Sequence, residues 1–219
     1  MHLLYFADPL CSWCYGFGPQ LAALLARHPG ARLDLVMGGL RPYNTQTMSP
    51  EFKEMLRGHW KHVREASGLP FSEAILARED FVYDTEPPCR AVVTARALDA
   101  AKAREFLGAV QAAFYRDARE VTRPEVLADL AAEAGYERAT FLERLESEEM
   151  RAETRLDFST AQSLGVTGFP TLGLARGDQL YLVASGYTAA DVLDERIAEF
   201  ERLASAKAQA GTAAPACGA

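Results

Sequence analysis

Apolar residues recur at two different periods along this chain, and the change of period divides it into three parts. Short apolar runs at Leu3–Phe6 and Leu33–Met37 are typical of buried strands, while Leu21, Leu24 and Leu25 between them have helical spacing. These segments predict a βαβ unit, in which the strands are parallel because the helix makes the crossover.

The middle part, from about Ser49 to Gly165, has helical spacing throughout. Ser49-Pro50 predicts a capped helix start, and Thr122-Arg123-Pro124-Glu125 has the spacing of a capping box. In the first of these helices one face is predicted to carry Phe52, Met55, Leu56, His59 and Val63. Further helices are predicted near 87–98, 102–117, 136–147 and 148–164.

Strand signals return after Gly165. Residues 171–174 and 180–183 are separated by Arg176-Gly177-Asp178, which predicts a β-hairpin. Thr188 is then predicted to cap a last helix that ends near Ala204. Beyond it the chain is rich in Ala, Gly, Lys and Gln, which predicts a flexible tail over 205–219.

Composition narrows the class of protein. The net charge is −7, from 23 basic and 30 acidic residues, and no basic stripe occurs, which argues against nucleic acid and an anionic membrane surface as partners. No apolar stretch approaches the ~20 residues of a membrane span, and no signal peptide is recognised before the first strand. We therefore expect a cytoplasmic protein, in which four cysteines are poor candidates for structural disulfides.

The pair Cys11-Ser12-Trp13-Cys14 lies at a strand-to-helix junction, where two thiols can exchange disulfides. At the start of a helix, free N–H groups and the dipole favour the thiolate of Cys11. Cys14, one turn further on, is placed to attack a mixed disulfide formed by Cys11. The alternative, a zinc half-site, lacks the second ligand pair that structural zinc requires, so no metal is expected.

Taken together, the βαβ start with C-x-x-C, the ββα end and Gly168-Phe169-Pro170-Thr171 resemble the thioredoxin superfamily. The helical block between them resembles that of DsbA-type oxidoreductases, and residues 8–17 resemble the cytoplasmic DsbA-like group that includes FrnE-type proteins. The resemblance implies an α/β, thioredoxin-like fold with a helical insertion: residues 1–45 and 152–204 form the thioredoxin-like domain and 46–151 the insertion.

The resemblance also implies roles for matching residues. Cys11 would attack and Cys14 resolve, and Pro170 would be a cis-proline beside them, with the Phe169 backbone free to pair with an extended substrate. Ser12, Trp13 and Phe169 would line the site. The buried acid of thioredoxins is replaced by Tyr5, and Asp8 in the following loop is the nearest carboxylate.

Two further cysteines leave alternatives open. Cys89, at a predicted helix start, is interpreted as a core residue, with an auxiliary redox role if that helix end faces Cys11. Cys217, in the predicted tail, is either incidental or a third thiol that reaches Cys11.

The function expected is thiol–disulfide exchange with protein or small-thiol substrates, including disulfide isomerisation, with no organic cofactor. Expected partners are protein thiols and disulfides, glutathione, and a thioredoxin-type reductant; direction, substrate and oligomeric state are left open. The alternatives are a glutathione-dependent transferase or isomerase of the kappa-class type, which the second thiol at Cys14 disfavours, and a non-enzymatic metal- or peptide-binding protein.

Overall fold

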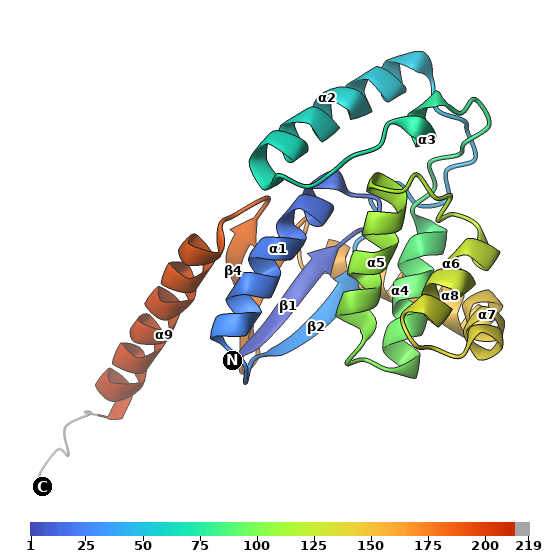
Figure 1. Cartoon of the computed structure of the whole chain (residues 1–219). Helices are drawn as coiled ribbons and strands as arrows, with labels where there is room; N and C mark the ends of the chain where they lie inside the picture. The colour runs from blue at the N-terminus through green and yellow to red at the C-terminus, as the bar shows by residue number, and fades with distance from the viewer. Residues whose placement is uncertain (213–219) are drawn as a thin grey trace, which may run out of the picture.

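The thirteen helices and strands described follow the order β-α-β, seven helices, β-β-α. The structure is a computed structural model and describes residues 1–212. The elements are β1 (His2–Ala7), α1 (Ser12–Arg27), β2 (Arg32–Met37), α2 (Pro50–Ser67), α3 (Ala74–Ala77), α4 (Glu86–Leu98), α5 (Ala103–Tyr115), α6 (Pro124–Glu133), α7 (Arg138–Glu146), α8 (Glu148–Ser163), β3 (Thr171–Arg176), β4 (Gln179–Ser185) and α9 (Ala190–Thr212) (Figure 1).

The four strands form one mixed sheet in the order β2-β1-β3-β4. β1 pairs in parallel with β2, as the βαβ interpretation predicted, and antiparallel with β3, which forms the predicted hairpin with β4. The fold expected from the sequence is therefore confirmed: an α/β, thioredoxin-like arrangement with many helices between β2 and β3.

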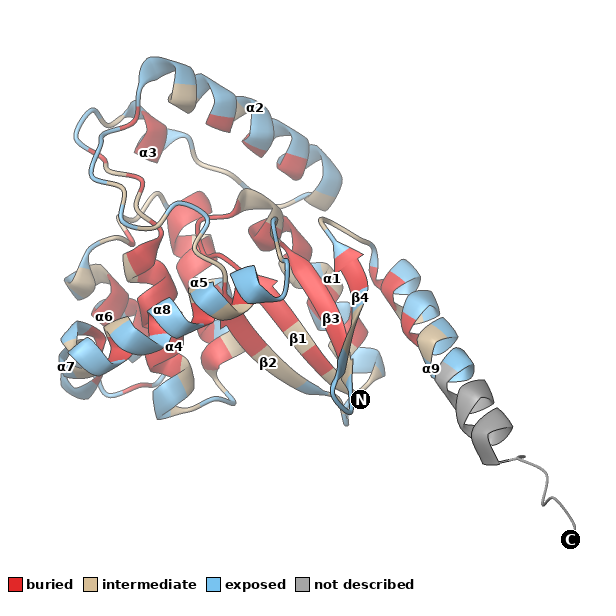
Figure 2. Ribbon diagram, turned by 180° about the vertical axis from the view of Figure 1, so that it is seen from behind, coloured by how far each residue is buried: buried red, intermediate tan, exposed pale blue. Residues whose placement is uncertain are grey.

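Helices cover both faces of the sheet. On one face, Leu3 and Tyr5 of β1 belong to the main hydrophobic core together with α1 residues such as Leu21 and Leu24. On the other, Phe6 packs with Ala161 of α8, and Figure 2 shows α8 running across this side. The alternation of side chains along β1 thus determines which layer each residue contacts.

The main core extends without a break from the sheet into the helices between β2 and β3. It includes small and aliphatic residues of α4, and aromatic residues of α5, of α7 and of the loop before α4. The division into 1–45 plus 152–204 and 46–151 therefore remains a prediction, and the two parts share one continuous core.

Several local expectations need correction. α1 begins at Ser12, well before the residues whose apolar spacing predicted it, the first of which is Leu21. The short α3 gave no sequence signal. In α2 the buried residues are Leu56, Trp60 and Val63, whereas Met55 and His59 are exposed. The predicted shared face is therefore only partly buried, and part of it is the wall of a surface pocket.

Two predicted caps are also wrong. α6 begins at Pro124 after Arg123, and no side-chain cap forms, because Thr122 lies one position too early. At the start of α9 the N–H of Ala190 is accepted by Oε1 of Gln20, at 2.9 Å, while the Thr188 hydroxyl donates to the Gly186 carbonyl. By contrast, Ser49 caps α2 as predicted, accepting from the Phe52 N–H.

The last helix is longer than expected. α9 continues past Ala204 to Thr212, so the predicted tail cannot begin at 205. The rest of that prediction, including Cys217, lies outside the described residues. Within residues 1–212 no helix combines the length and apolarity needed to cross a lipid bilayer.

Candidate active site

The first turn of α1 holds the two cysteines of the C-x-x-C pair. Cys11 is the N-cap residue: its backbone is extended (φ −88°, ψ 113°), and its carbonyl accepts the N–H of Tyr15 at 3.1 Å. As the N-cap residue, Cys11 lies at the positive end of the helix dipole. Its thiol accepts no hydrogen bond from the first-turn N–H groups, so these remain available to stabilise a thiolate. Cys14 follows within the same turn.

The two thiols differ in exposure. Cys11 is 6% exposed and lines a surface pocket, whereas Cys14 is fully buried. Burial raises the pKa of the Cys14 thiol well above its usual value, and a hydrogen bond and charge interaction with Cys11 raise it further. Both cysteines are free thiols in this structure. The two cysteines interact with each other, and only the Cys11 sulfur is accessible from the pocket.

The segment before β3 lies against Cys11. The Phe169–Pro170 peptide bond is cis, as predicted, and Pro170 is buried at the start of the strand. The Cys11 thiol donates to the Phe169 carbonyl at 3.3 Å, joining residues 158 positions apart. The structure thus brings together the three residues that the sequence placed in the site: Cys11, Cys14 and Pro170.

The Phe169 ring is positioned by a glycine at the end of β2. A Cβ atom at Gly38 would lie 1.9 Å from Cζ of Phe169, far inside van der Waals contact, so the ring occupies the space that a side chain there would need. The Gly38 N–H donates to the Ala7 carbonyl at 2.8 Å, which fixes the backbone at this point. Gly38 therefore allows the close approach of the Phe169 segment.

The pocket at Cys11 has a volume of about 410 Å³ and is formed by five parts of the chain. The predicted residues Ser12, Trp13 and Phe169 all line it. The ring of Trp13 packs against that of Tyr187, with centroids 5.8 Å apart. Tyr15 and Phe17, which follow the cysteine pair in the sequence, are buried in the core. The remaining lining residues are Leu10, Leu40, Arg41, Phe52, Met55, Leu56, His59, Tyr83 and Gly168.

Behind this pocket lies a buried carboxylate that also contacts the third cysteine. Asp8 is fully buried; it accepts the N–H groups of Leu10 at 2.8 Å and Leu40 at 2.7 Å, and the Cys89 thiol donates to it at 3.4 Å. Burial raises the pKa of Asp8 despite these hydrogen bonds. Burial also raises the pKa of Cys89, and the charge of Asp8 adds to the effect. Cys89 is thus a buried residue at the start of α4 that does not line the pocket.

Tyr5 occupies the position where thioredoxins have a buried acid. It is 2% exposed, its ring lies 5.7 Å from that of Phe17, and burial followed by interaction with Cys14 and Cys11 raises the pKa of its hydroxyl. A phenol with a raised pKa is neutral, so the carboxylate nearest to the cysteine pair in the sequence is that of Asp8, in the loop between β1 and α1.

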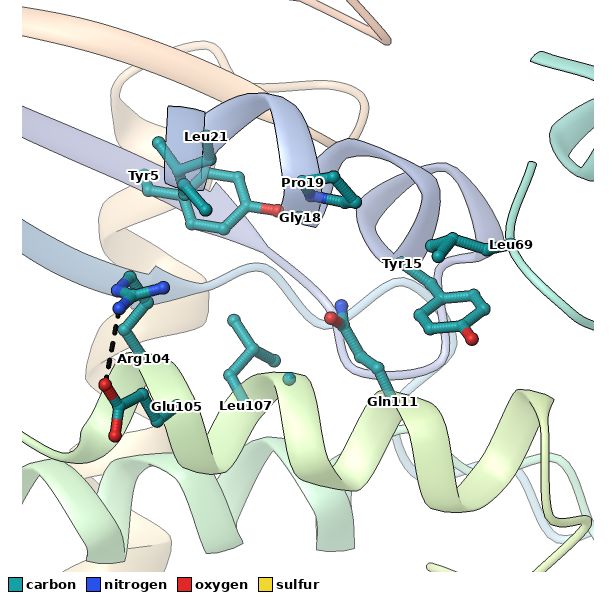
Figure 3. Close-up of a pocket in the computed structure, with 12 residues that line it drawn as sticks. Tyr5, Tyr15, Gly18, Pro19, Leu21, Leu69, Arg104, Glu105, Leu107 and Gln111 are labelled. Carbon is teal, nitrogen blue, oxygen red and sulfur yellow. Dashed lines mark ion pairs between the residues drawn. The ribbon is translucent and has the colours of Figure 1, made fainter. Parts of the chain in front are cut away.

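A second pocket, of about 280 Å³, lies between α1 and α5 (Figure 3). Tyr5 forms part of its wall, and Gln111 of α5 points into it with a buried amide nitrogen that has no partner. At its edge Arg104 and Glu105 pair with each other at 3.5 Å. Among the described residues no group of three His, Cys, Asp or Glu side chains could hold a metal ion.

Sequence reasoning missed the residues that reach the pocket from far along the chain. Arg41 follows the Gly38-Gly39 turn, Phe52 and His59 belong to α2, and the Tyr83 hydroxyl donates to the Leu10 carbonyl. None of them lies in a motif. The one signal in the sequence was that Phe52, Met55, Leu56 and His59 share one face of a predicted helix, which did not link that face to Cys11.

Comparison with known proteins places this geometry in a family. The model of the DSBA-like thioredoxin domain matches residues 2–198, nearly the whole described chain. The chain belongs to the DSBA-like thioredoxin domain family. The resemblance inferred from the sequence is therefore confirmed.

Solved structures of DsbA-like proteins resemble this one over almost all of its length. A candidate protein disulfide isomerase from Nitrosomonas europaea is 31% identical and superposes with a TM-score of 0.87, covering 92% of this chain and 98% of the other. The cytosolic disulfide reductase DsbM from Pseudomonas aeruginosa is 30% identical, with a TM-score of 0.77 over 93% and 98% of the two chains. A second structure of DsbM, with a TM-score of 0.76, contains GSH.

More distant relatives share less. The ClpXP adapter protein SpxH of Halalkalibacterium halodurans is 24% identical over 176 residues, so the match covers 78% of this chain but only 57% of that protein. A 2-hydroxychromene-2-carboxylate isomerase, at 17% identity and a TM-score of 0.63, shares the fold alone.

Proposed function

We propose that this protein is a thiol–disulfide oxidoreductase in which Cys11 exchanges with the substrate and Cys14 resolves the mixed disulfide. The observation that carries the proposal is the asymmetry of the pair: Cys11 faces a pocket at a helix N-terminus, while Cys14 is buried in contact with it. Membership of the DsbA-like family supports it.

In the reducing direction the Cys11 thiolate attacks one sulfur of a substrate disulfide. A Cys11–substrate disulfide forms and the other substrate sulfur leaves as a thiolate, which takes up a proton. Cys14, on losing its proton, attacks the Cys11 sulfur and releases the second substrate thiol. The protein ends as the Cys11–Cys14 disulfide, and its two electrons reside on the substrate; oxidation of a dithiol is the reverse sequence.

The backbone around Pro170 supplies the second half of the site. In this structure the Phe169 carbonyl accepts from the free Cys11 thiol. When Cys11 becomes a thiolate or a mixed disulfide it has no proton to donate, and this carbonyl becomes available to an N–H of an extended substrate. Trp13 and Phe169 contribute apolar side chains to the wall of the same pocket.

Glutathione is the small-thiol partner that we propose, alongside protein thiols and a thioredoxin-type reductant that returns the pair to its dithiol form. The DsbM structure with GSH supports a glutathione partner, and the description of DsbM as cytosolic supports a cytoplasmic site of action. The chemistry takes place between sulfur atoms and requires no organic cofactor.

Reduction of insulin disulfides and of hydroxyethyl disulfide, with glutathione as electron donor, tests the proposal. The wild type is expected to turn over both, and Cys11→Ser is expected to abolish turnover. Cys89→Ala, which removes a cysteine outside the pocket, serves as the matched control and keeps most of the activity. Equal activity of Cys11→Ser and wild type would refute the mechanism, and glutathione conjugation that survives Cys14→Ala would favour a transferase instead.

A further inference from the structure

The wall of the pocket at Cys11 contains few charged side chains. Of its thirteen lining residues only Arg41 carries a permanent charge, His59 is the one other basic side chain, and neither Asp nor Glu lines it. The protein has seven more acidic than basic residues, yet no carboxylate lines the wall around the reactive sulfur.

Arg41 is held in place at its backbone and along its side chain. Its N–H donates to Oγ1 of Thr85 at 3.1 Å, and its carbonyl accepts the Thr85 N–H at 3.2 Å. Thr85 is fully buried at the start of α4, so this anchor belongs to the core. The guanidinium lies over the ring of Phe52, 4.5 Å from its centroid, and such stacking orients the plane while leaving its edge free to donate.

The guanidinium N–H groups of Arg41 donate no hydrogen bond to another residue within the described part of the chain. Other arginines pair with carboxylates, as Arg90 does with Glu86 and Arg96 with Asp157, both at 2.8 Å. No ion pair of Arg41 occurs among the described residues. Asp8 does not pair with the positive charge of Arg41 either. Its carboxylate does not line the pocket and already accepts hydrogen bonds from Leu10, Leu40 and Cys89.

From this arrangement we infer that the site selects thiols and disulfides that carry a carboxylate close to the reacting sulfur, and that Arg41 is the residue that recognises it. A planar guanidinium with a free edge matches a carboxylate with two parallel hydrogen bonds. The inference rests on the proposed function and specifies its substrate class. The carboxylate can belong to a small free thiol such as glutathione or to an acidic side chain next to a cysteine in a polypeptide.

The test compares second-order rate constants for oxidation of the reduced protein by an anionic and a neutral disulfide, glutathione disulfide and hydroxyethyl disulfide. In Arg41→Gln the constant for glutathione disulfide is expected to fall about fivefold, equivalent to about 1 kcal/mol, because one exposed charge contact is lost. The constant for hydroxyethyl disulfide, which has no carboxylate, is expected to fall much less, so that the ratio of the two constants drops. Arg41→Lys is expected to restore part of the preference, and added salt to weaken it in the wild type.

Arg64→Gln is the matched control. Arg64 also lies over a phenylalanine ring, that of Phe71 at 5.8 Å, but does not line the pocket. Its replacement is expected to leave both rate constants unchanged. If Arg41→Gln leaves the ratio of the two constants at the wild-type value, the inference is wrong.

Two peptide disulfides separate the sources of the carboxylate. They are identical except for Glu or Gln next to the cysteine. A fivefold loss in Arg41→Gln with glutathione disulfide alone assigns the residue to a small thiol, and a loss with the Glu peptide alone assigns it to polypeptides; either supports the inference. If neither neutral nor anionic disulfides oxidise the wild type, the proposed function itself fails, which is a different result from oxidation without charge preference.

Discussion

At the scale of single residues, Asp8 shows how burial and hydrogen bonding oppose each other in this site. Its side chain accepts two backbone N–H groups and one thiol, which favours the carboxylate, yet burial outweighs them and raises its pKa. The same three contacts tie the loop before Cys11 to Leu40 and to α4. Asp8 therefore holds the cysteine loop in position at an electrostatic cost.

That balance predicts the pH dependence of Asp8→Asn. Because the pKa of Asp8 is raised on folding, the folded state holds more protons than the unfolded state just above the usual pKa of aspartate. Wild-type stability therefore falls as pH rises through that interval. Asparagine removes this slope but has one acceptor oxygen, so at pH 4 the variant is expected to be less stable by about 1–3 kcal/mol. Its deficit is expected to shrink towards pH 7.

Urea unfolding of both proteins at pH 4, 5, 6 and 7 measures the effect. Asp178→Asn, in the exposed turn between β3 and β4, controls for the loss of a charge. Parallel stability curves for wild type and Asp8→Asn would show that Asp8 does not titrate in this range.

At the scale of elements, the close contact between the end of β2 and the Phe169 segment sets the geometry beside Cys11. In Gly38→Ala the new methyl group would overlap the Phe169 ring, which must then move. We expect a loss of about 1–3 kcal/mol in stability from overpacking. The rate of disulfide exchange is expected to fall about tenfold because the Phe169 carbonyl shifts away from Cys11.

Gly58→Ala is the matched control for this substitution. Gly58 lies within α2, where a Cβ atom would meet nothing within 4 Å, so alanine is expected to raise stability by about 0.5–1 kcal/mol through helix propensity. Wild-type exchange rates in Gly38→Ala, measured with hydroxyethyl disulfide, would contradict the positioning role of this contact.

The local elements could be predicted because their signals are local. The β1 run, the hairpin turn at Gly177-Asp178 and the Ser49-Pro50 cap each involve neighbouring residues, and all three form as expected. The cysteine pair and the cis bond at Pro170 followed from a resemblance that spans the whole chain. Periodicity could not assign the α2 face, because Met55 and His59 line a pocket whose other wall comes from distant segments.

The long-range contacts of the site could not be predicted from the sequence. Arg41, which sequence reasoning missed, contacts Thr85 and Phe52. Asp8 and Cys89 were both singled out in the sequence, but their contact joins positions 81 residues apart. Nothing in the local sequence distinguishes these residues from solvated charges or core thiols. Their contacts form because the fold brings β2, α2 and α4 to the start of α1.

At the scale of the whole molecule, the helices between β2 and β3 are bound to the sheet as well as to one another. Arg96 of α4 donates to Asp157 of α8 and to the Leu35 carbonyl of β2, and Asp157 also accepts the Met37 N–H at 2.8 Å. With a continuous hydrophobic core, these contacts favour unfolding of the two predicted parts as one unit.

The two tryptophans of the chain report on the two parts separately. Trp13 lies in α1 at the pocket, and Trp60 is buried in α2. In Trp13→Phe and Trp60→Phe, the remaining tryptophan is expected to show the same urea midpoint by fluorescence as far-ultraviolet circular dichroism does. Separated midpoints within one variant would show that residues 46–151 unfold as an independent domain.

Disulfide exchange at this site requires that the substrate react with the Cys11 sulfur, because Cys14 and Cys89 are fully buried. Cys14→Ser should stop the reaction at the mixed disulfide, because the thiol that we propose as the resolving one has been removed. After reaction of this reduced variant with glutathione disulfide, peptide mass spectrometry is expected to find glutathione on Cys11. Glutathione on Cys89 instead, or none on Cys11, would contradict the account.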